Sequence, residues 1–407
     1  MFYIDYLFFY QAGAFLICRV ILGLIREKGI MMARTRTKKK PKVCLVLQGG
    51  GALGAYHIGA YQALEEAGYT PDWFAGISIG ALNSAILAGN KPEDRLNKLI
   101  DFWDRISRPE TDVDLLPSMA PMFNIFSASQ ALIMGQPGFF VPRIINPWLS
   151  LPGESATSFY DTSPLFSTID DLSDFSIINQ QKARLTVGAT SVTKGELVFF
   201  DSHTQPLQPA HAVASGSLPP GFPATKIGDD HYWDGGCVSN SPINGILDLA
   251  EKDEDLLVFM VDLWNAKGEL PQTMSEVLWR EKEIQYASRS CEHIEALVAK
   301  RNLDHILEHS KDVVDSEQVP DVVSLKVGRH IDIVHITFEP LKGHIPLSDA
   351  EFSRRSIRLR REAGYEDMTK AIKESPWTQR SKKLPTHYHP RQEHGGWVEG
   401  DEISKAS

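Results

Sequence analysis

The chain has 407 residues, of which 43% are hydrophobic and 23% are charged, and this composition excludes a disordered, collagen-like or disulfide-stapled protein. Its formal net charge of −10 argues against a nucleic-acid partner. The four cysteines are widely spaced and form no C-x-x-C pair, which favours a reducing, cytoplasmic location and argues against a cysteine zinc site.

Residues 1–42 form a basic and apolar extension ahead of the first predicted strand. The apolar run at residues 6–18 is 13 residues long, which is too short for a bilayer core of about 30 Å. The basic residues follow this run, whereas a secretory signal carries its positive charge in front. Two interpretations stay open: translation starts at Met31 or Met32, or the extension contacts an anionic membrane surface as a peripheral anchor.

Two strand–turn–helix units follow the extension. The continuous apolar run Val43–Leu47 predicts a buried strand, which leads through the glycine-rich turn at 49–54 into a helix. The run Trp73–Ile77 predicts a second strand, which leads through a turn at 76–80 into a helix of small residues. Units of this kind, repeated at short spacing, predict an α/β fold with a parallel sheet.

The rest of the chain divides by composition. Residues 115–164 carry seven prolines and many large apolar side chains without regular periodicity, and we interpret them as an insertion in a domain that spans residues 43–248. Residues 249–375 form an accessory region, and residues 376–407 form a loose tail rich in Pro, His and Gly. The patterns predict further strands at Leu185–Ala189, Leu197–Phe200, Leu256–Val261 and Ile331–Phe338, and helices at 275–309 and 348–373.

The last predicted helix is strongly basic, on a chain that is otherwise acidic. One interpretation is a patch that binds an anionic membrane. The other is docking onto the preceding domain by pairing with acids such as those of Glu251–Asp255. The neighbouring Phe352 and Ile357 favour docking, because they give the helix a packed side. The arginines of this helix are Arg354, Arg355, Arg358, Arg360 and Arg361.

The glycine-rich turn also fits a dinucleotide-binding pattern, G-x-G-x-x-G, with Asp72 about twenty residues further on. In dinucleotide-binding proteins the acidic residue ends the second strand. Here Asp72 precedes the second strand and Ser78 stands at its end. We therefore disfavour a dinucleotide enzyme.

Ser78 lies in a G-x-S-x-G pattern between Gly76 and Gly80, where a strand passes into a helix. Glycines on both sides allow the sharp turn that exposes a nucleophilic hydroxyl, and the helix N-terminus favours developing negative charge. The run Gly49–Gly51 offers consecutive backbone N–H groups that suit an oxyanion. The pattern indicates nucleophilic catalysis by Ser78.

A serine nucleophile needs a base, and the sequence offers two candidates. Asp234 stands between Trp233 and a pair of glycines, where partial desolvation would raise the basicity of its carboxylate. His231, just upstream, is the alternative base.

In their order and spacing, these motifs resemble those of the patatin-like phospholipase family, serine acyl hydrolases with a Ser–Asp dyad. The segments Ala214–Pro223 and Ser239–Pro242 also resemble that family, and residues 347–372 resemble an accessory region of some bacterial members. The resemblance implies a three-layer fold, a mostly parallel sheet flanked by helices, with a C-terminal mixed extension. It implies Ser78 as nucleophile and Asp234 as proton acceptor. The glycines that it implicates are Gly49, Gly50, Gly51 and Gly54 in the oxyanion loop, Gly76 and Gly80 in the elbow, and Gly235 and Gly236 beside the base.

The function that the resemblance implies is hydrolysis of lipid or other carboxylic esters, as a phospholipase A-like enzyme or a carboxylesterase, through an acyl-enzyme and without metal or cofactor. The alternative is an inactive binding or scaffold relative, although none of the motif residues is lost. The insertion at 115–164 is expected to form a lid over an acyl pocket, or else only to pack its aromatic side chains onto the sheet. We expect a lipid or ester substrate, peripheral membrane contact and no nucleic-acid partner.

Overall fold

A single mixed sheet forms the centre of the part of the chain that the computed structural model describes. That part comprises residues 40–108, 118–152, 157–250, 255–287, 290–309, 330–341, 344–378 and 385–390. The two interpretations of the N-terminal extension concern residues outside it.

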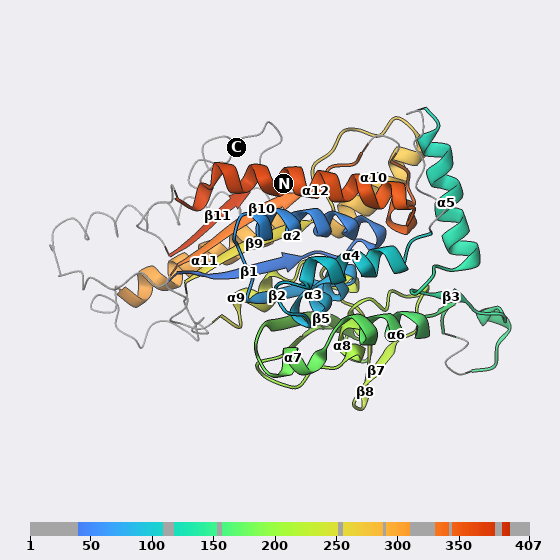
Figure 1. Cartoon of the computed structure of the whole chain (residues 1–407), viewed down its shortest axis with the longest axis horizontal. Coiled ribbons are helices and arrows are strands. Elements are labelled where there is room, and N and C mark those ends of the chain that lie inside the picture. Colours follow the sequence, from blue (N-terminus) through green and yellow to red (C-terminus); the bar gives the residue numbers. More distant parts are fainter. Residues whose placement is uncertain are drawn as a thin grey trace, which may run out of the picture. The chain divides into compact units, whose positions relative to one another are not determined.

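Nine strands of the described residues form this sheet: β1 (Lys42–Leu47), β2 (Trp73–Ile77), β5 (Arg184–Ser191), β6 (Leu197–Asp201), β7 (Thr225–Ile227), β8 (Asp230–Asp234), β9 (Leu256–Asp262), β10 (Ile331–Thr337) and β11 (Thr386–Pro390). Their order is β11-β10-β9-β1-β2-β5-β8-β7, and β6 also pairs with β5. Neighbours from β11 to β5 are parallel, whereas β6, β7 and β8 pair antiparallel. The predicted α/β fold with a mostly parallel sheet is confirmed (Figure 1).

Helices cover both faces of the sheet. The described helices are α2 (Tyr56–Glu66), α3 (Ile79–Ala88), α4 (Arg95–Arg105), α5 (Ala120–Met134), α6 (Ser163–Leu172), α7 (Phe175–Asn179), α8 (Pro209–Ser215), α9 (Ile243–Leu247), α10 (Met274–Ala287), α11 (Ser290–His309) and α12 (Arg354–Glu374). Side chains of β1 alternate between the faces, so that Leu45 and Leu47 join a core with α2 and α3, whereas Cys44 and Val46 join one with α9 and α11. The fold therefore has three layers. Within the described residues no helix is both long enough and apolar enough to cross a membrane.

The accessory region and the tail both contribute strands to the same sheet. β9 lies between β1 and β10, so these two strands of the accessory region, β9 and β10, extend the sheet of the preceding domain. β11 lies in the segment predicted as a loose tail, yet it pairs with β10 as the edge strand. The sequence pattern missed β11 because the strand is held through backbone hydrogen bonds, and of its side chains only Tyr388 is large and hydrophobic.

The basic helix α12 packs along α2, and the two helices come so close that a side chain at Gly59 or Gly364 would collide with the opposite backbone. Arg361 donates to Gln62 at 2.7 Å. The helix therefore docks onto the preceding domain as predicted, but the contact of Arg361 is with a neutral side chain and not with an acid. Of the proposed acidic partners at Glu251–Asp255, residues 251–254 lie outside the described residues, and the Asp255 carboxylate accepts from the backbone N–H of His330 instead.

The insertion contains a regular helix, α5, although its sequence shows no amphipathic periodicity. The residues that α5 buries are small or polar, including Ala128 and Ala131, whereas large side chains such as Met122 and Phe126 are exposed. Apolar residues thus occupy both sides of the helix, so the sequence lacks the alternation of apolar and polar faces from which a helix is predicted. A short hairpin of β3 (Val141–Pro142) and β4 (Tyr160–Asp161) follows it.

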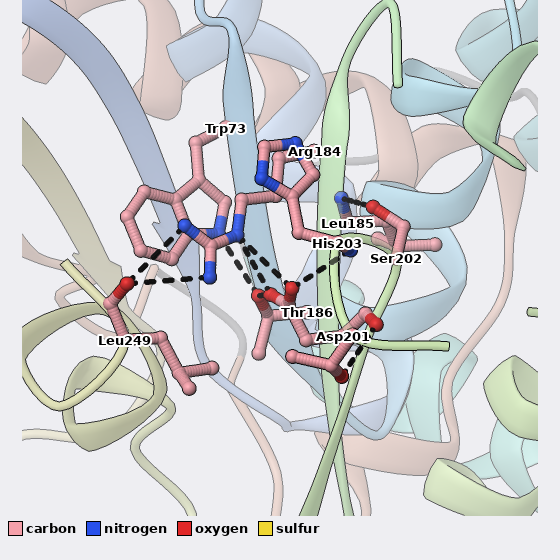
Figure 2. Close-up of polar contacts among 9 residues, drawn as sticks. Trp73, Arg184, Leu185, Thr186, Asp201, Ser202, His203 and Leu249 are labelled. Atoms are coloured by element: carbon pink, nitrogen blue, oxygen red, sulfur yellow. Dashed lines mark hydrogen bonds and ion pairs between the residues drawn. The ribbon is translucent and has the colours of Figure 1, made fainter. Parts of the chain in front are cut away.

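A buried ion pair lies where β2 and β5 begin (Figure 2). This is the opposite end of β2 from Ser78. The Arg184 guanidinium contacts Asp201 at 2.9 Å and stacks on the ring of Trp73, 3.8 Å from its centroid. Arg184 also donates to the carbonyl of Leu249, and the hydroxyl of Thr186 donates to Asp201. Because both charges are paired and hydrogen-bonded, the network fixes the chain after α9 against the sheet.

Candidate active site

Ser78 stands in a tight turn between β2 and α3. Its backbone has φ 55° and ψ −129°, a conformation that a non-glycine residue rarely adopts. A side chain at Gly76 would collide with the backbone of Gly80, and one at Gly80 would collide with the carbonyl of Leu47. Only glycine fits on either side, so the sequence pattern has a direct steric cause.

The hydroxyl of a second serine, Ser215, fixes this turn through two hydrogen bonds. The backbone N–H of Ser78 donates to Oγ of Ser215 at 3.0 Å, and Oγ of Ser215 donates to the carbonyl of Gly188 in β5. Ser215 ends α8 within the segment Ala214–Pro223. The helix α3 begins directly after Ser78, so the partial positive charge of its N-terminus lies beside the hydroxyl.

Asp234 ends β8 and faces Ser78. Its side chain is 1% exposed, and it accepts hydrogen bonds from the Ser78 side chain and, at 2.7 Å, from the N–H of Gly236. Burial raises the pKa of this carboxyl to about 7, while the two hydrogen bonds oppose the rise. Gly235 lies directly beneath, against the carbonyl of Gly188. A carboxylate with a pKa near neutrality suits a general base.

His231 is not brought to this serine. It is exposed on β8, and it does not line the pocket that contains Ser78 and Asp234. The geometry therefore favours Asp234 over the alternative base.

The glycine loop follows β1, and Gly49, Gly50 and Gly51 line the same pocket as Ser78. The carbonyl of Gly49 accepts from Nδ2 of Asn240 at 2.9 Å and from Nε1 of Trp264 at 2.8 Å. In a trans peptide the next N–H points the opposite way, so these two contacts fix the direction of the Gly50 N–H.

Gly54 lies outside the pocket. It belongs to the short helical turn η1 (Gly51–Ala55), packs against Ile79, and accepts a hydrogen bond from Asn83 through its carbonyl. Because Gly54 has no side chain, η1 can pack closely against Ile79 of α3.

The C-terminal region holds the other side of the glycine loop. Arg360 of α12 is buried and donates to the carbonyls of Ala52, Ser348 and Glu351 at 2.8–2.9 Å. The carbonyl of Asp349 lies against Gly51.

Sequence reasoning missed Asn240, Trp264 and Arg360 as site residues. The sequence places Asn240 only within a segment that resembles the family, and nothing around Trp264 indicates a site residue. Arg360 could have been identified from its helical spacing, because it lies on the same buried side of α12 as Ile357 and Gly364.

The pocket above Ser78 has a volume of about 290 Å³ and a mostly apolar lining, at the small end of ligand sites. From the insertion come Leu132, Phe139, Phe140 and Tyr160. Phe139 and Phe140 are buried and both contact Phe222, so they line the pocket and pack the insertion at once. Among the described residues, no three His, Cys, Asp or Glu side chains are grouped so as to hold a metal ion.

Comparison with known proteins matches most of the chain to two family models. A family model described as "Patatin-like phospholipase" matches residues 45–247, and one described as "Patatin phospholipase" matches residues 284–384. Together they match about three quarters of the chain.

Individual relatives match less of the chain. It is 39% identical over 83 residues to "Patatin-like phospholipase domain-containing protein 6" of Homo sapiens, and 35% identical over 86 residues to "Neuropathy target esterase sws" of Drosophila melanogaster. These matches cover 20% and 21% of this chain and only 6% of each relative. Among solved structures, VipD from Legionella pneumophila is 16% identical with a TM-score of 0.35, covering 86% of this chain and 72% of that chain. Human GIVD cytosolic phospholipase A2 is 11% identical with a TM-score of 0.39, covering 84% and 60%.

The matched residues include all three glycine-rich motifs and, in the second model, the helix that holds the glycine loop. The chain belongs to the patatin-like phospholipase family.

Proposed function

We propose that this protein is a serine acyl-ester hydrolase, a phospholipase A-like enzyme or carboxylesterase, with Ser78 as nucleophile and Asp234 as proton acceptor. The observation that carries the proposal is the hydrogen bond between the Ser78 and Asp234 side chains, inside an apolar pocket bordered by the glycine loop. Nucleophile, base and oxyanion donors are then within reach of one bound ester.

The reaction proceeds in two steps. Asp234 accepts the proton of the Ser78 hydroxyl as Oγ attacks the ester carbonyl, and the oxyanion is held by backbone N–H groups of Gly50 and Gly51. The proton passes from Asp234 to the departing alcohol, which leaves the acyl group on Ser78. Water then loses a proton to Asp234 and attacks the acyl-enzyme. Asp234 returns that proton to Oγ of Ser78 as the acyl–oxygen bond breaks, which releases the carboxylic acid and free Ser78. Base and electrophilic donors come from the chain itself.

Labelling with an alkyl fluorophosphonate tests the proposal. We expect stoichiometric labelling of the wild type and none of Ser78→Ala. A panel of p-nitrophenyl esters of increasing chain length, assayed in parallel, reports turnover. Absence of both labelling and turnover would instead support an inactive binding or scaffold relative.

The raised pKa of Asp234 predicts a pH dependence of activity. The base must be ionised in the free enzyme, so kcat/KM should rise with pH and reach half its maximum at about pH 7. Initial rates with a short p-nitrophenyl ester between pH 5 and 9 measure this. A half-maximum near pH 4 would contradict a buried base.

The same group also predicts a pH dependence of stability. In the unfolded chain Asp234 loses its proton near its ordinary pKa of 3.8, whereas in the folded chain it keeps the proton until about pH 7. The folded state therefore binds more protons in this window, and the free energy of unfolding falls as pH rises through it. Asp234→Asn removes this contribution, so urea unfolding should show the variant more stable than wild type at pH 8 but not at pH 4. An equal difference at both pH values would exclude linkage to this carboxyl.

The pocket lining predicts an effect on substrate length. Phe140→Ala, like Phe139→Ala, enlarges the apolar pocket and should change the preference among long-chain esters more than the turnover of short ones. The measurement is kcat/KM across the p-nitrophenyl series. Phe166→Ala, on α6 and outside the pocket, is the matched control. Equal losses on short and long esters together with a lower melting temperature would show that these rings serve packing alone.

A further inference from the structure

Residues 119–151 present an exposed apolar surface, which we call the apolar face. Between Ser118 and Pro152 the chain has a single charged residue, Arg143, although 23% of all residues are charged. Large apolar side chains along this segment are exposed to solvent, including Met122, Phe126, Ile133, Ile144, Trp148 and Leu151. A monomeric protein in water rarely leaves so many large apolar side chains exposed together.

On α5 the exposed apolar side chains follow the helical repeat. Met122, Phe126 and Ile133 repeat at spacings of four and seven residues, so they share one side of the helix, while Ala128 and Ala131 face the protein. The polarity of the helix is therefore reversed, with small side chains inward and large ones outward. Figure 1 shows α5 standing at one end of the described elements, with α11 at the other.

The apolar face is continuous with the mouth of the active-site pocket. Leu132 on α5 and Leu218 both line the pocket and are partly exposed. The Tyr160 hydroxyl donates to the carbonyl of Leu132 at 2.8 Å, which ties the end of α5 to the pocket wall. The apolar face and the wall of the pocket therefore share Leu132.

We propose that the apolar face docks on the surface of a phospholipid bilayer and delivers a membrane lipid to Ser78. This inference rests on the proposed function, because a lipid ester resides in such a surface. Residues 119–151 contain no carboxylate that docking would desolvate. Their one cation, Arg143, is half-buried and donates from Nε to Oγ of Ser158 at 3.1 Å, so the exposed side chains of the face are uncharged. Exposed Trp148 is a residue that favours the interface between headgroups and acyl chains.

The chemistry of the face predicts how docking depends on lipid and salt. Burial of uncharged side chains needs no anionic lipid, so neutral phosphatidylcholine vesicles should suffice and added salt should change binding little. Binding through the basic residues 26–42 would require anionic lipid and would be lost at high salt.

The test uses the full chain carrying Ser78→Ala, so that vesicles stay intact. Sedimentation with phosphatidylcholine vesicles at 0.1 M and 1 M salt should show binding at both. Phe126→Glu combined with Ile133→Glu should weaken it about tenfold or more, because each side chain otherwise buries a large apolar area. Leu303→Glu, an exposed leucine on α11, should bind like the parent.

Activity separates this inference from the proposed function. In the active enzyme the Phe126→Glu, Ile133→Glu variant should keep its turnover of a short soluble ester and lose hydrolysis of vesicle lipid. Vesicle binding without any ester turnover would refute the proposed function and leave the docking surface standing. Unchanged vesicle binding by the variant would overturn the docking surface, as would binding that requires anionic lipid. A dimer in solution that this variant dissociates would also overturn it, because a second copy would then cover the face.

Discussion

Ser78→Ala and Asp234→Asn are each expected to lower kcat for ester hydrolysis by at least about 10³-fold while leaving the fold intact. Alanine removes the attacking oxygen. Asparagine keeps the shape and the contact with the Gly236 N–H, but it cannot accept the proton of Ser78. Steady-state kinetics with a short p-nitrophenyl ester and circular dichroism of each variant measure the two parts of this expectation.

Two further variants make the assignment sharp. Ser78 and Asp234 act on one proton, so the double variant should be no slower than the slower single variant. His231→Ala is the matched control, because His231 is exposed outside the pocket and should leave kcat near wild type. An inactive His231→Ala beside an active Asp234→Asn would show that the base is the histidine.

Arg360→Met is expected to lower the free energy of unfolding by about 3–5 kcal/mol, because it removes the cation that pairs with the buried carboxylate of Glu351. It also releases the carbonyl of Ala52, which belongs to the glycine loop. The kcat for a short ester should therefore fall in the fraction that stays folded. Urea unfolding and kinetics below the unfolding transition separate the two effects.

Arg358→Met is the control on the same helix. Arg358 is 42% exposed and lies 3.8 Å from Glu362, so its loss should change stability by no more than about 1 kcal/mol. Similar losses for both variants would show that α12 needs only its total positive charge. A stable, fully active Arg360→Met would exclude a role in holding the loop.

Local sequence was sufficient for the elements that carry Ser78 and the glycine loop. Val43–Leu47 and Trp73–Ile77 are continuous apolar runs because β1 and β2 lie in the middle of the sheet and are covered on both faces. The glycines around Ser78 are forced by backbone contacts within a few residues or with the adjacent strand. Such short-range constraints leave a residue pattern that can be read.

Local sequence failed where an element is stabilised by something other than its own pattern. Apolar residues on both sides of α5 concealed the helix, and β11 is held by its backbone pairing with β10. The placement of residues 249–375 was equally hidden, since the position of β9 between β1 and β10 depends on strands far apart in the chain.

The sequence by itself determined the α/β fold, the turn at Ser78 and the candidate nucleophile, and its residue pattern left the base open between Asp234 and His231. Only the tertiary structure decided which groups hold the glycine loop: Asn240, Trp264 and Arg360 reach it from 191, 215 and 308 residues away. All three donate to backbone carbonyls. Because every residue carries a carbonyl, such a bond constrains the donor alone, and the loop's own sequence keeps no trace of it.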